Sequence, residues 1–269
     1  MSLPSMKDVE PTKMTLKSEF KFMCYKEVKC FTKCCSNINI LLSPYDILRM
    51  KKKLNMSSEE FLDRYTYMEI DNTSKQPLVR LKMQDDNEKK CPFVTPEGCT
   101  IYTDRPTNCR YYPVGQGTLR KEGQEGPVNE EFYFFIREPH CLGYQEDREW
   151  TIESWRVDQG VEVYDEMNRE WKEIQLRRNP LLKELDSNKQ AQIYTASYDM
   201  DRFRRYVFES RFLDVFDIDK DESERMKTDE IALMKFGFKY IKFLLLLENT
   251  MKLKKEFIIF CKRNARKIP

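Results

Sequence analysis

The stretch CPFVTPEGCTIYTDRPTNCRYYP, residues 91–113, sets three cysteines among prolines and aromatic residues, and the fold of this region depends on it. Either residue of Thr103-Asp104 can cap a short helical turn that has Pro106 in its first positions, where proline is tolerated. Cys109 then projects from this turn back toward the hairpin that carries Cys99. The pattern therefore predicts that thiols far apart along the stretch approach one another.

Further cysteines lie on both sides of this stretch. Cys30 and Cys34 are four residues apart, so on a helical turn their sulfur atoms face the same side and can ligate one centre. Cys34 and Cys35 are adjacent, and adjacent side chains point in different directions. This pair more naturally serves two centres, or one centre and a thiol beside it. Eight cysteines suit two four-thiolate sites: Cys24, Cys30, Cys34, Cys35, Cys91, Cys99, Cys109 and Cys141.

The ninth cysteine and the single histidine are interpreted differently. Cys261 lies in an apolar run of the last expected helix, where a free cysteine packs as a small hydrophobe. His140 directly precedes Cys141, and a lone histidine is more often hydrogen-bonded or exposed than a ligand. Five basic residues near cysteines can donate hydrogen bonds to sulfur, although a solvated surface role is commoner: Lys26, Lys29, Lys33, Arg105 and Arg110.

Size and composition favour metal or redox chemistry for the thiols. A chain of 269 residues can bury a core without disulfide staples, and its N-terminus has no signal-peptide pattern. Nine cysteines in such a chain indicate reduced thiols and a cytoplasmic location. Soft sulfur ligands select zinc or iron–sulfur clusters. The absence of C-x2-C weakens zinc-ribbon, thioredoxin-like and bacterial two-cluster ferredoxin interpretations. The spacing alone leaves zinc and iron open.

Several function classes are excluded or disfavoured. The chain has 8 glycines and neither a dinucleotide-binding nor a P-loop motif. One histidine excludes sites that need two or three imidazoles. A formal net charge of +2 does not indicate nucleic-acid binding, and lysines interrupt the most apolar stretch, residues 231–261, so no membrane span is expected. An unidentified redox or protein partner remains.

The pattern CPF…GC-x-IY-x-x-RP-x-x-CR-x-YP closely resembles the signature of the YkgJ-like cysteine-cluster family of zinc- or iron-chelating domains. The upstream cluster Cys24-x5-Cys30-x3-Cys34-Cys35 departs from that family's commonest C-x2-C-x2-C-C form. Its wider gaps are more similar to those of the related flagellin lysine N-methylases, which also end this cluster in Cys-Cys. The resemblance covers roughly residues 20–145.

The resemblance implies metal chelation by the eight cysteines up to Cys141, as one or two iron–sulfur clusters of the 4Fe-4S type. The leading hypothesis is an iron–sulfur protein with a redox or electron-transfer role. A structural zinc protein that binds a partner is the alternative from another class. A third is an S-adenosylmethionine-dependent protein N-methylase-like enzyme, although the usual glycine-rich nucleotide loop is missing. No enzymatic activity is assigned.

The expected fold is α-rich α+β. A flexible arm (1–20) precedes an irregular cysteine-rich metal-binding domain with short strands (21–145), and a helical region (146–269) covers it. Helices are expected after Ser43-Pro44 and Ser57, and then over 151–179, 199–216 and 221–266, the last broken near Asn249-Thr250. Strands are expected at 78–83 and 131–137, with a glycine-rich loop at 114–126.

Overall fold

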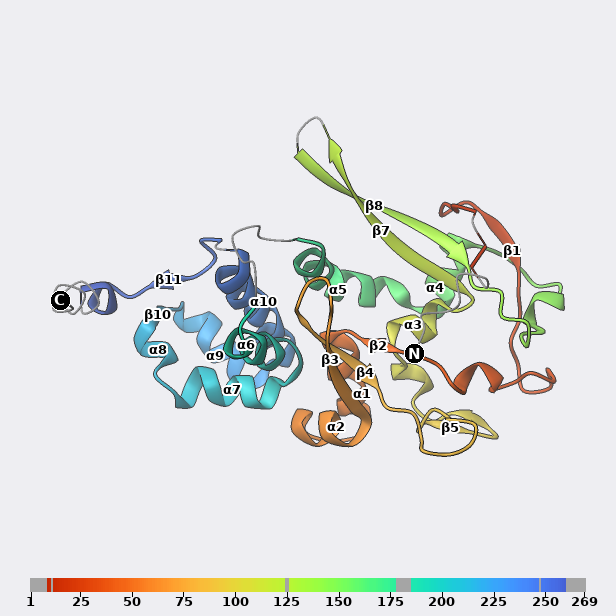
Figure 1. Ribbon diagram of the computed structural model, residues 1–269, viewed down its shortest axis with the longest axis horizontal. Helices are drawn as coiled ribbons and strands as arrows, with labels where there is room; N and C mark the ends of the chain where they lie inside the picture. The colour runs from red at the N-terminus through yellow and green to blue at the C-terminus, as the bar shows by residue number, and fades with distance from the viewer. Residues whose placement is uncertain (1–8, 11, 124–125, 178–184, 247, 260–269) are drawn as a thin grey trace. The chain divides into compact units, whose positions relative to one another are not determined.

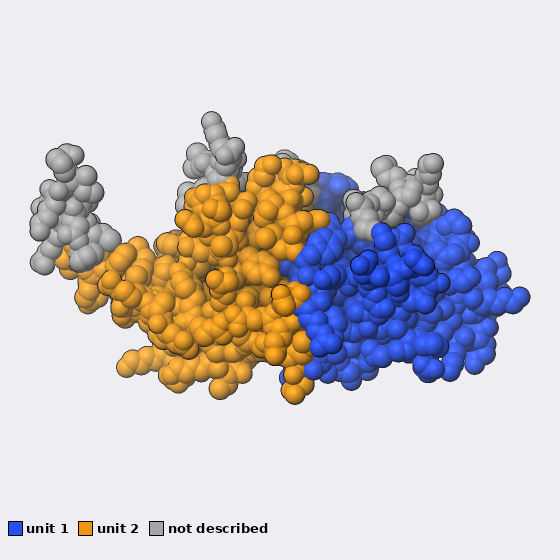
Figure 2. Space-filling model, turned by 60° about the horizontal axis from the view of Figure 1, so that its bottom comes forward, with its two compact units in different colours: residues 1–54, 64–67, 79–169 blue, residues 55–63, 68–78, 170–269 orange. Residues whose placement is uncertain are grey.

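The computed structural model describes residues 9–259 except 11, 124–125, 178–184 and 247 (Figure 1). It is a mixed α+β fold that divides into two compact units, coloured separately in Figure 2. Unit 1 comprises residues 1–54, 64–67 and 79–169, and unit 2 comprises residues 55–63, 68–78 and 170–269. Short strands in the cysteine-rich region and a helical C-terminal part confirm the expected fold class. The domain boundaries expected from the sequence stay a prediction.

Unit 1 is built from short elements. In chain order they are β1 (Glu19–Lys21), η1 (Lys33–Cys35), β2 (Leu41–Leu42), α1 (Pro44–Lys53), β5 (Val94–Thr95), β6 (Gly98–Cys99), η2 (Tyr102–Asp104), α3 (Thr107–Tyr111), β7 (Val114–Gly123), β8 (Gly126–Phe135), η3 (Gly143–Gln145), β9 (Glu149–Thr151) and α4 (Ile152–Gln159). The strands pair antiparallel as β1–β9, β5–β6 and β7–β8, and β2 pairs with β4.

Four elements have residues in both units: α2 (Ser58–Tyr65), β3 (Thr66–Ile70), β4 (Pro77–Leu81) and α5 (Val161–Leu176). The rest of unit 2 is α6 (Ser187–Tyr198), α7 (Met200–Glu209), α8 (Phe212–Val215), β10 (Phe216–Asp217), α9 (Lys220–Thr228), α10 (Glu230–Leu246) and β11 (Lys252–Leu253). Strands β10 and β11 pair antiparallel. No helix within the described residues is long and apolar enough to span a membrane.

The longest strand pair, β7–β8, corrects one expectation. The glycine-rich segment predicted as a loop is strand β7, paired along its whole length with β8 (Figure 1). The glycines are needed because Phe134 and Phe132 lie across them. A Cβ atom at Gly115 would stand 2.2 Å from the ring of Phe134, and one at Gly117 would stand 2.2 Å from the ring of Phe132. The expected strand at 131–137 is confirmed as the end of β8.

The N-terminal segment contacts the other edge of β8. The Glu10 amide donates to the Phe135 carbonyl at 3.0 Å, and Met14 exchanges backbone hydrogen bonds with Tyr133. The Met14 side chain is buried in the core of unit 1. The predicted mobility of residues 1–20 stays a prediction.

The expected helix starts are confirmed, whereas two long helices are divided. Ser43 and Asp46 form a capping box at the start of α1, and Thr151 caps α4. The helix expected over 151–179 breaks at Gly160, whose φ of 62° is left-handed and ends α4 before α5 begins. Glycine in this conformation outweighs the apolar periodicity that continues past it.

The C-terminal helices are also shorter than expected. The helix predicted from Asp199 ends at Glu209, and α8 follows as a separate turn. A second break falls at Asp229, whose side chain accepts hydrogen bonds from the amides of Ile231 and Ala232 and so begins α10. Helix α6 was not expected. Cys261 lies outside the described residues.

Candidate metal centre

All eight cysteines of the first 141 residues lie in unit 1. Cys24 and Cys30 stand in a series of turns after β1, Cys34 and Cys35 are in η1, and Cys91 precedes β5. Cys99 ends β6, Cys109 is in the middle of α3, and Cys141 precedes η3. All eight are free thiols in the described part of the chain. Helical turns and short strands thus present thiols from distant parts of the sequence.

Four of the thiols form a first neighbourhood. Cys24 is close enough to Cys34, Cys30 and Cys141 for their charges to raise its pKa. Cys141 is likewise affected by Cys30 and Cys34. A direct contact joins Cys30 to the segment of Cys141, because the Leu142 amide donates to the Cys30 sulfur at 3.2 Å. Residues more than a hundred positions apart are therefore brought together.

Three thiols from the quoted stretch form a second neighbourhood. Cys109 is affected by Cys91 and Cys99, and Cys91 is affected by Cys99. Both Cys109 and Cys91 also interact with Cys34, whose thiol contacts that of Cys35. Cys34 therefore belongs to both neighbourhoods, and the eight thiols form one connected set. The assignment of the adjacent pair to two centres stays a prediction.

Burial favours the protonated form of five of these thiols when no cation is bound. Desolvation raises the pKa of the Cys24 thiol and that of the Cys91 thiol to about 11. It also raises the pKa of Cys99, Cys109 and Cys141, in each case as the largest cause. For Cys34 the largest cause is the contact with the Cys35 thiol, which raises its pKa. A cation would have to displace these protons to bind.

Backbone amides oppose this effect at several sulfur atoms. The amides of Phe93, Ile101 and Gly143, each two residues after a cysteine, donate toward Cys91, Cys99 and Cys141 and lower the thiol pKa. The Leu142 amide donates to the Cys30 sulfur at 3.2 Å. Amide donors aimed at sulfur stabilise thiolates and are the contacts that tune metal–thiolate centres. Half of the set therefore has donors prepared for the ionised form.

A buried carboxylate fixes the helix that carries Cys109. Asp46, only 1% exposed, accepts hydrogen bonds from the Thr107 amide at 2.8 Å and from the Thr107 hydroxyl at 2.7 Å. Its other oxygen accepts from the Ser43 amide at 2.9 Å. One side chain thus joins the start of α1 to the start of α3. The sequence signals the Ser43–Asp46 box but gives no sign of the bond to Thr107.

Gly143 permits the close approach on which the first neighbourhood depends. A Cβ atom at this position would lie 2.5 Å from the Phe22 ring and 2.8 Å from the Met23 carbonyl oxygen. The Met23 amide also donates to the Gly143 carbonyl at 3.0 Å. The residue next to Cys24 therefore meets the residue two after Cys141 through backbone alone. Sequence reasoning missed this contact because a glycine after a cysteine has no distinctive pattern.

The basic residues near the cysteines differ in exposure and in their contacts. Lys26, Lys29 and Lys33 are exposed. Arg110 is buried and bonds the carbonyls of Arg105 and Gln159. Its role is structural.

Arg105 and His140 lie beside cysteines of different neighbourhoods. Arg105 stacks 3.8 Å from the ring centre of Tyr102, and its charge lowers the pKa of the Cys99 thiol, although burial raises that pKa overall. His140 is 39% exposed and lies 3.4 Å from a carboxylate oxygen of Glu138. Of the five basic residues considered from the sequence, Arg105 is the one whose charge reaches a sulfur atom in the contacts described.

The donor set fits a soft metal, but the thiols do not form a finished cage. Within the described ranges, no three or more His, Cys, Asp or Glu side chains are arranged to hold a metal ion. Several of the thiols have a raised pKa, so metal loading requires the loss of protons. The assignment of the eight cysteines as ligands stays a prediction.

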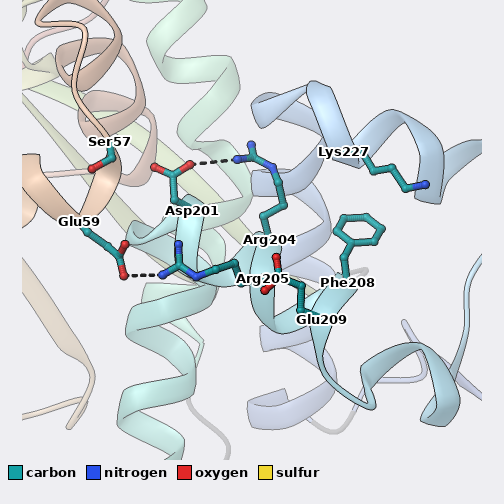
Figure 3. Close-up of a pocket in the computed structure, with 8 residues that line it drawn as sticks. All are labelled: Ser57, Glu59, Asp201, Arg204, Arg205, Phe208, Glu209 and Lys227. Carbon is teal, nitrogen blue, oxygen red and sulfur yellow. Dashed lines mark hydrogen bonds and ion pairs between the residues drawn. The ribbon is translucent and has the colours of Figure 1, made fainter.

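A pocket of about 420 Å³ in unit 2 contains none of the cysteines (Figure 3). Its charged walls are paired. Arg204 meets Asp201 at 3.0 Å and Arg205 meets Glu59 at 2.5 Å, whereas Lys227 meets Glu224 at 2.6 Å. These pairs neutralise the basic side chains that line the pocket. We assign it no ligand.

Comparison with known proteins places the cysteine set in a family. Residues 23–142 match the family model CxxCxxCC, described as a "putative zinc- or iron-chelating domain". The matched range contains all eight cysteines and leaves the helical C-terminal region outside. No curated protein and no solved structure matched the chain. The cysteine-rich segment, with its connected thiols and their amide donors, is therefore similar to this family of zinc- or iron-chelating domains.

Proposed function

We propose that this protein binds iron–sulfur clusters through its eight cysteines, as one or two 4Fe-4S centres. The observation that carries the proposal is the connected set of eight free thiols, which is the number that two four-thiolate centres need. Zinc–sulfur bonds of about 2.3 Å would hold four thiolates roughly 3.8 Å apart around one ion. A cluster is larger, since its own iron and sulfide occupy the centre, and its ligand thiolates stand farther apart than those around one zinc ion.

The two neighbourhoods supply an arrangement for two centres. Cys24, Cys30 and Cys141 would hold one, and Cys91, Cys99 and Cys109 the other. The adjacent Cys34 and Cys35 would complete them with one thiolate each. The amides at Cys30, Cys91, Cys99 and Cys141 would donate to ligand sulfur.

Bound clusters supply one-electron transfer. The chain's own contribution is to exclude water, because most of these thiols are buried or half-buried, and to set the charge around the sulfur atoms. We infer a redox or electron-transfer role with an unidentified partner protein. Free thiols require a reducing compartment, which supports a cytoplasmic location.

Anaerobic purification followed by visible spectroscopy tests the proposal, with iron, zinc and acid-labile sulfide counted per chain. We expect brown protein that holds iron and sulfide in near-equal amounts. Colourless protein with zinc and no sulfide would overturn the cluster and leave a zinc-chelating domain. Zinc has a filled d shell and does not absorb in the visible, so the two results are distinct.

Single substitutions of the adjacent pair test the two-centre arrangement. We expect Cys34→Ser and Cys35→Ser each to lose part of the bound iron without losing all of it, because each would leave one centre with four thiolates. Cys261→Ser is the control, and it should keep the full iron content while lowering stability. Unchanged iron in both single variants would contradict the arrangement, and loss of iron in the control would show that the ligand set is incomplete.

A further inference from the structure

The side chain of Tyr112 stands at the junction of α3 and β7, beside the first neighbourhood of thiols. Its ring meets that of Phe22 edge-on at 6.3 Å, and both Tyr112 and Cys141 pack against the hydrophobic core of unit 1. The Tyr112 hydroxyl is buried and has no well-formed hydrogen bond to any described group. Leaving a buried hydroxyl unpaired is unfavourable, so this position needs an explanation.

Neighbouring tyrosines in unit 1 all have oxygen or nitrogen partners. The Tyr111 hydroxyl donates to the Asp165 carboxylate and accepts from Arg156 at 3.1 Å. The Tyr144 hydroxyl donates to the Ile136 carbonyl, and Tyr133 accepts a hydrogen bond from Arg156. The hydroxyls of Tyr111, Tyr133 and Tyr144 therefore all have hydrogen-bond partners, whereas that of Tyr112 does not.

Cys141 packs against the same core, and a Cβ atom at Gly143, two residues after it, would lie 2.5 Å from the Phe22 ring that Tyr112 meets edge-on. The Cys141 thiol is a polar group beside the Tyr112 hydroxyl. A neutral thiol is a weak acceptor, which explains why the hydrogen bond is poorly formed. A thiolate accepts far better, because a hydrogen bond to an ionised acceptor is about twice as strong as a neutral one.

We propose that Tyr112 is a positioning residue that donates a hydrogen bond to the Cys141 sulfur when that sulfur is a metal-bound thiolate. The proposal rests on the proposed cysteine centre and adds a named donor to it. Tyr112 and the amide of Gly143 would then approach the same sulfur from different directions. Neither donor carries a charge, so together they would fix the orientation of Cys141 without pairing it to a cation.

The hydrogen bond from Tyr112 should change the redox potential of the centre. A donor withdraws electron density from the ligand sulfur and stabilises the more negative, reduced state of the centre, which raises its potential. Loss of the donor should therefore make the potential more negative. It should also destabilise the ionised form of Cys141 in the metal-free protein.

The test compares Tyr112→Phe with the wild-type chain, and Tyr144→Phe is the matched control. The control also removes one buried hydroxyl beside Cys141, but that hydroxyl bonds a carbonyl. In reconstituted protein we expect a more negative midpoint potential for Tyr112→Phe and an unchanged one for Tyr144→Phe. In metal-free, reduced protein at pH 8 we expect iodoacetamide to alkylate Cys141 several-fold more slowly in Tyr112→Phe, with unchanged rates at Cys91 and Cys99.

The two measurements separate this proposal from the cluster proposal. If the wild-type chain takes up no iron and sulfide, the proposed function fails, and the alkylation rate of Cys141 still decides the role of Tyr112. A Cys141 rate equal to that of the wild type overturns the hydrogen bond. Equal loss of potential or reactivity in both tyrosine variants also overturns it, since both would then act only through packing.

Discussion

Asp46 is the residue on which the position of the second thiol neighbourhood most directly depends. Its carboxylate joins α1 to α3 through Thr107, two residues before Cys109. Burial raises the pKa of this carboxyl, while the bonds from Ser43 and Thr107 lower it. Burying this carboxylate carries a desolvation penalty, and removing it leaves its buried partners without an acceptor. Its effect on the metal site is indirect and acts through the placement of α3.

We expect Asp46→Ala to lower the free energy of unfolding by about 3 kcal/mol, since it leaves the amide and hydroxyl of Thr107 without their acceptor. Asp46→Asn keeps one acceptor oxygen and should lose less. Urea denaturation of the metal-free chain measures both. Metal uptake should also fall in the alanine variant because α3 loses its anchor. Equal stability of the two variants would contradict the role assigned to this carboxylate.

At the scale of elements, residues that end or cap a helix determine helix length more strongly than apolar periodicity does. Gly160 separates α4 from α5 because it adopts a left-handed conformation. Asp229 separates α9 from α10 because its side chain binds amides at the start of α10. The pKa of the Asp229 carboxyl is lowered, with the bond from the Ala232 amide as the largest cause. The ionised form is therefore the one that supports the helix.

This shift predicts a pH-dependent cap. A carboxyl with a lowered folded pKa adds stability above its unfolded pKa of about 3.9, and that stability is lost as the pH falls through the folded value. We expect Asp229→Ala to cost about 1 kcal/mol at pH 7 and much less at low pH. Asp229→Asn, which keeps an acceptor, should cost less at pH 7. Urea unfolding of the three proteins at pH 7 and pH 3 measures this, and a pH-independent alanine effect would contradict it.

At the scale of the whole molecule, the eight described cysteines lie in unit 1, whereas helices α6 to α10 lie in unit 2. Bound metal stabilises the state that holds it, so its effect should concentrate on unit 1. Unit 2 can be destabilised on its own at Gly237. There α10 approaches α6 so closely that a Cβ atom would lie 2.2 Å from the Ala196 carbonyl oxygen. The two units can therefore be perturbed separately.

We expect calorimetry of the reduced chain to resolve two transitions. Metal should raise the melting temperature of one, and Gly237→Ala should lower that of the other, because a backbone clash destabilises the α6–α10 contact by about 3 kcal/mol. Lys235→Ala, an alanine at an exposed site of the same helix, is the control and should change little. A single transition that responds equally to metal and to Gly237→Ala would contradict this separation.

Metal affinity should rise with pH because several of the thiols have a raised pKa. The buried thiols have raised pKa values, so each incoming cation displaces protons. The metal-free chain has the opposite dependence. A thiol with a raised folded pKa adds its full stability below the unfolded value near 9, and loses it as the pH rises toward about 11 for Cys24 and Cys91. Bound cation removes this loss.

By itself the sequence determined the helix starts and the identity of the thiol set. Ser43 and Thr151 cap helices because their hydroxyls meet amides only three residues away, and such local bonds can be read from neighbouring letters. The pattern from Cys91 to Pro113 is long enough to indicate the family, and the matched segment confirms it. Soft sulfur chemistry belongs to the cysteines wherever they lie.

Only the tertiary structure decided which thiols are neighbours and what supports them. The Leu142 amide meets the Cys30 sulfur across 112 positions, and the Asp46 carboxylate meets Thr107 across 61. In strand β7 the rings of Phe132 and Phe134 pack over two glycines, where a Cβ atom would clash, although the same glycines alone indicate a loop. These contacts depend on packing between distant segments, and no local propensity encodes the distance between residues that meet only after the chain has folded.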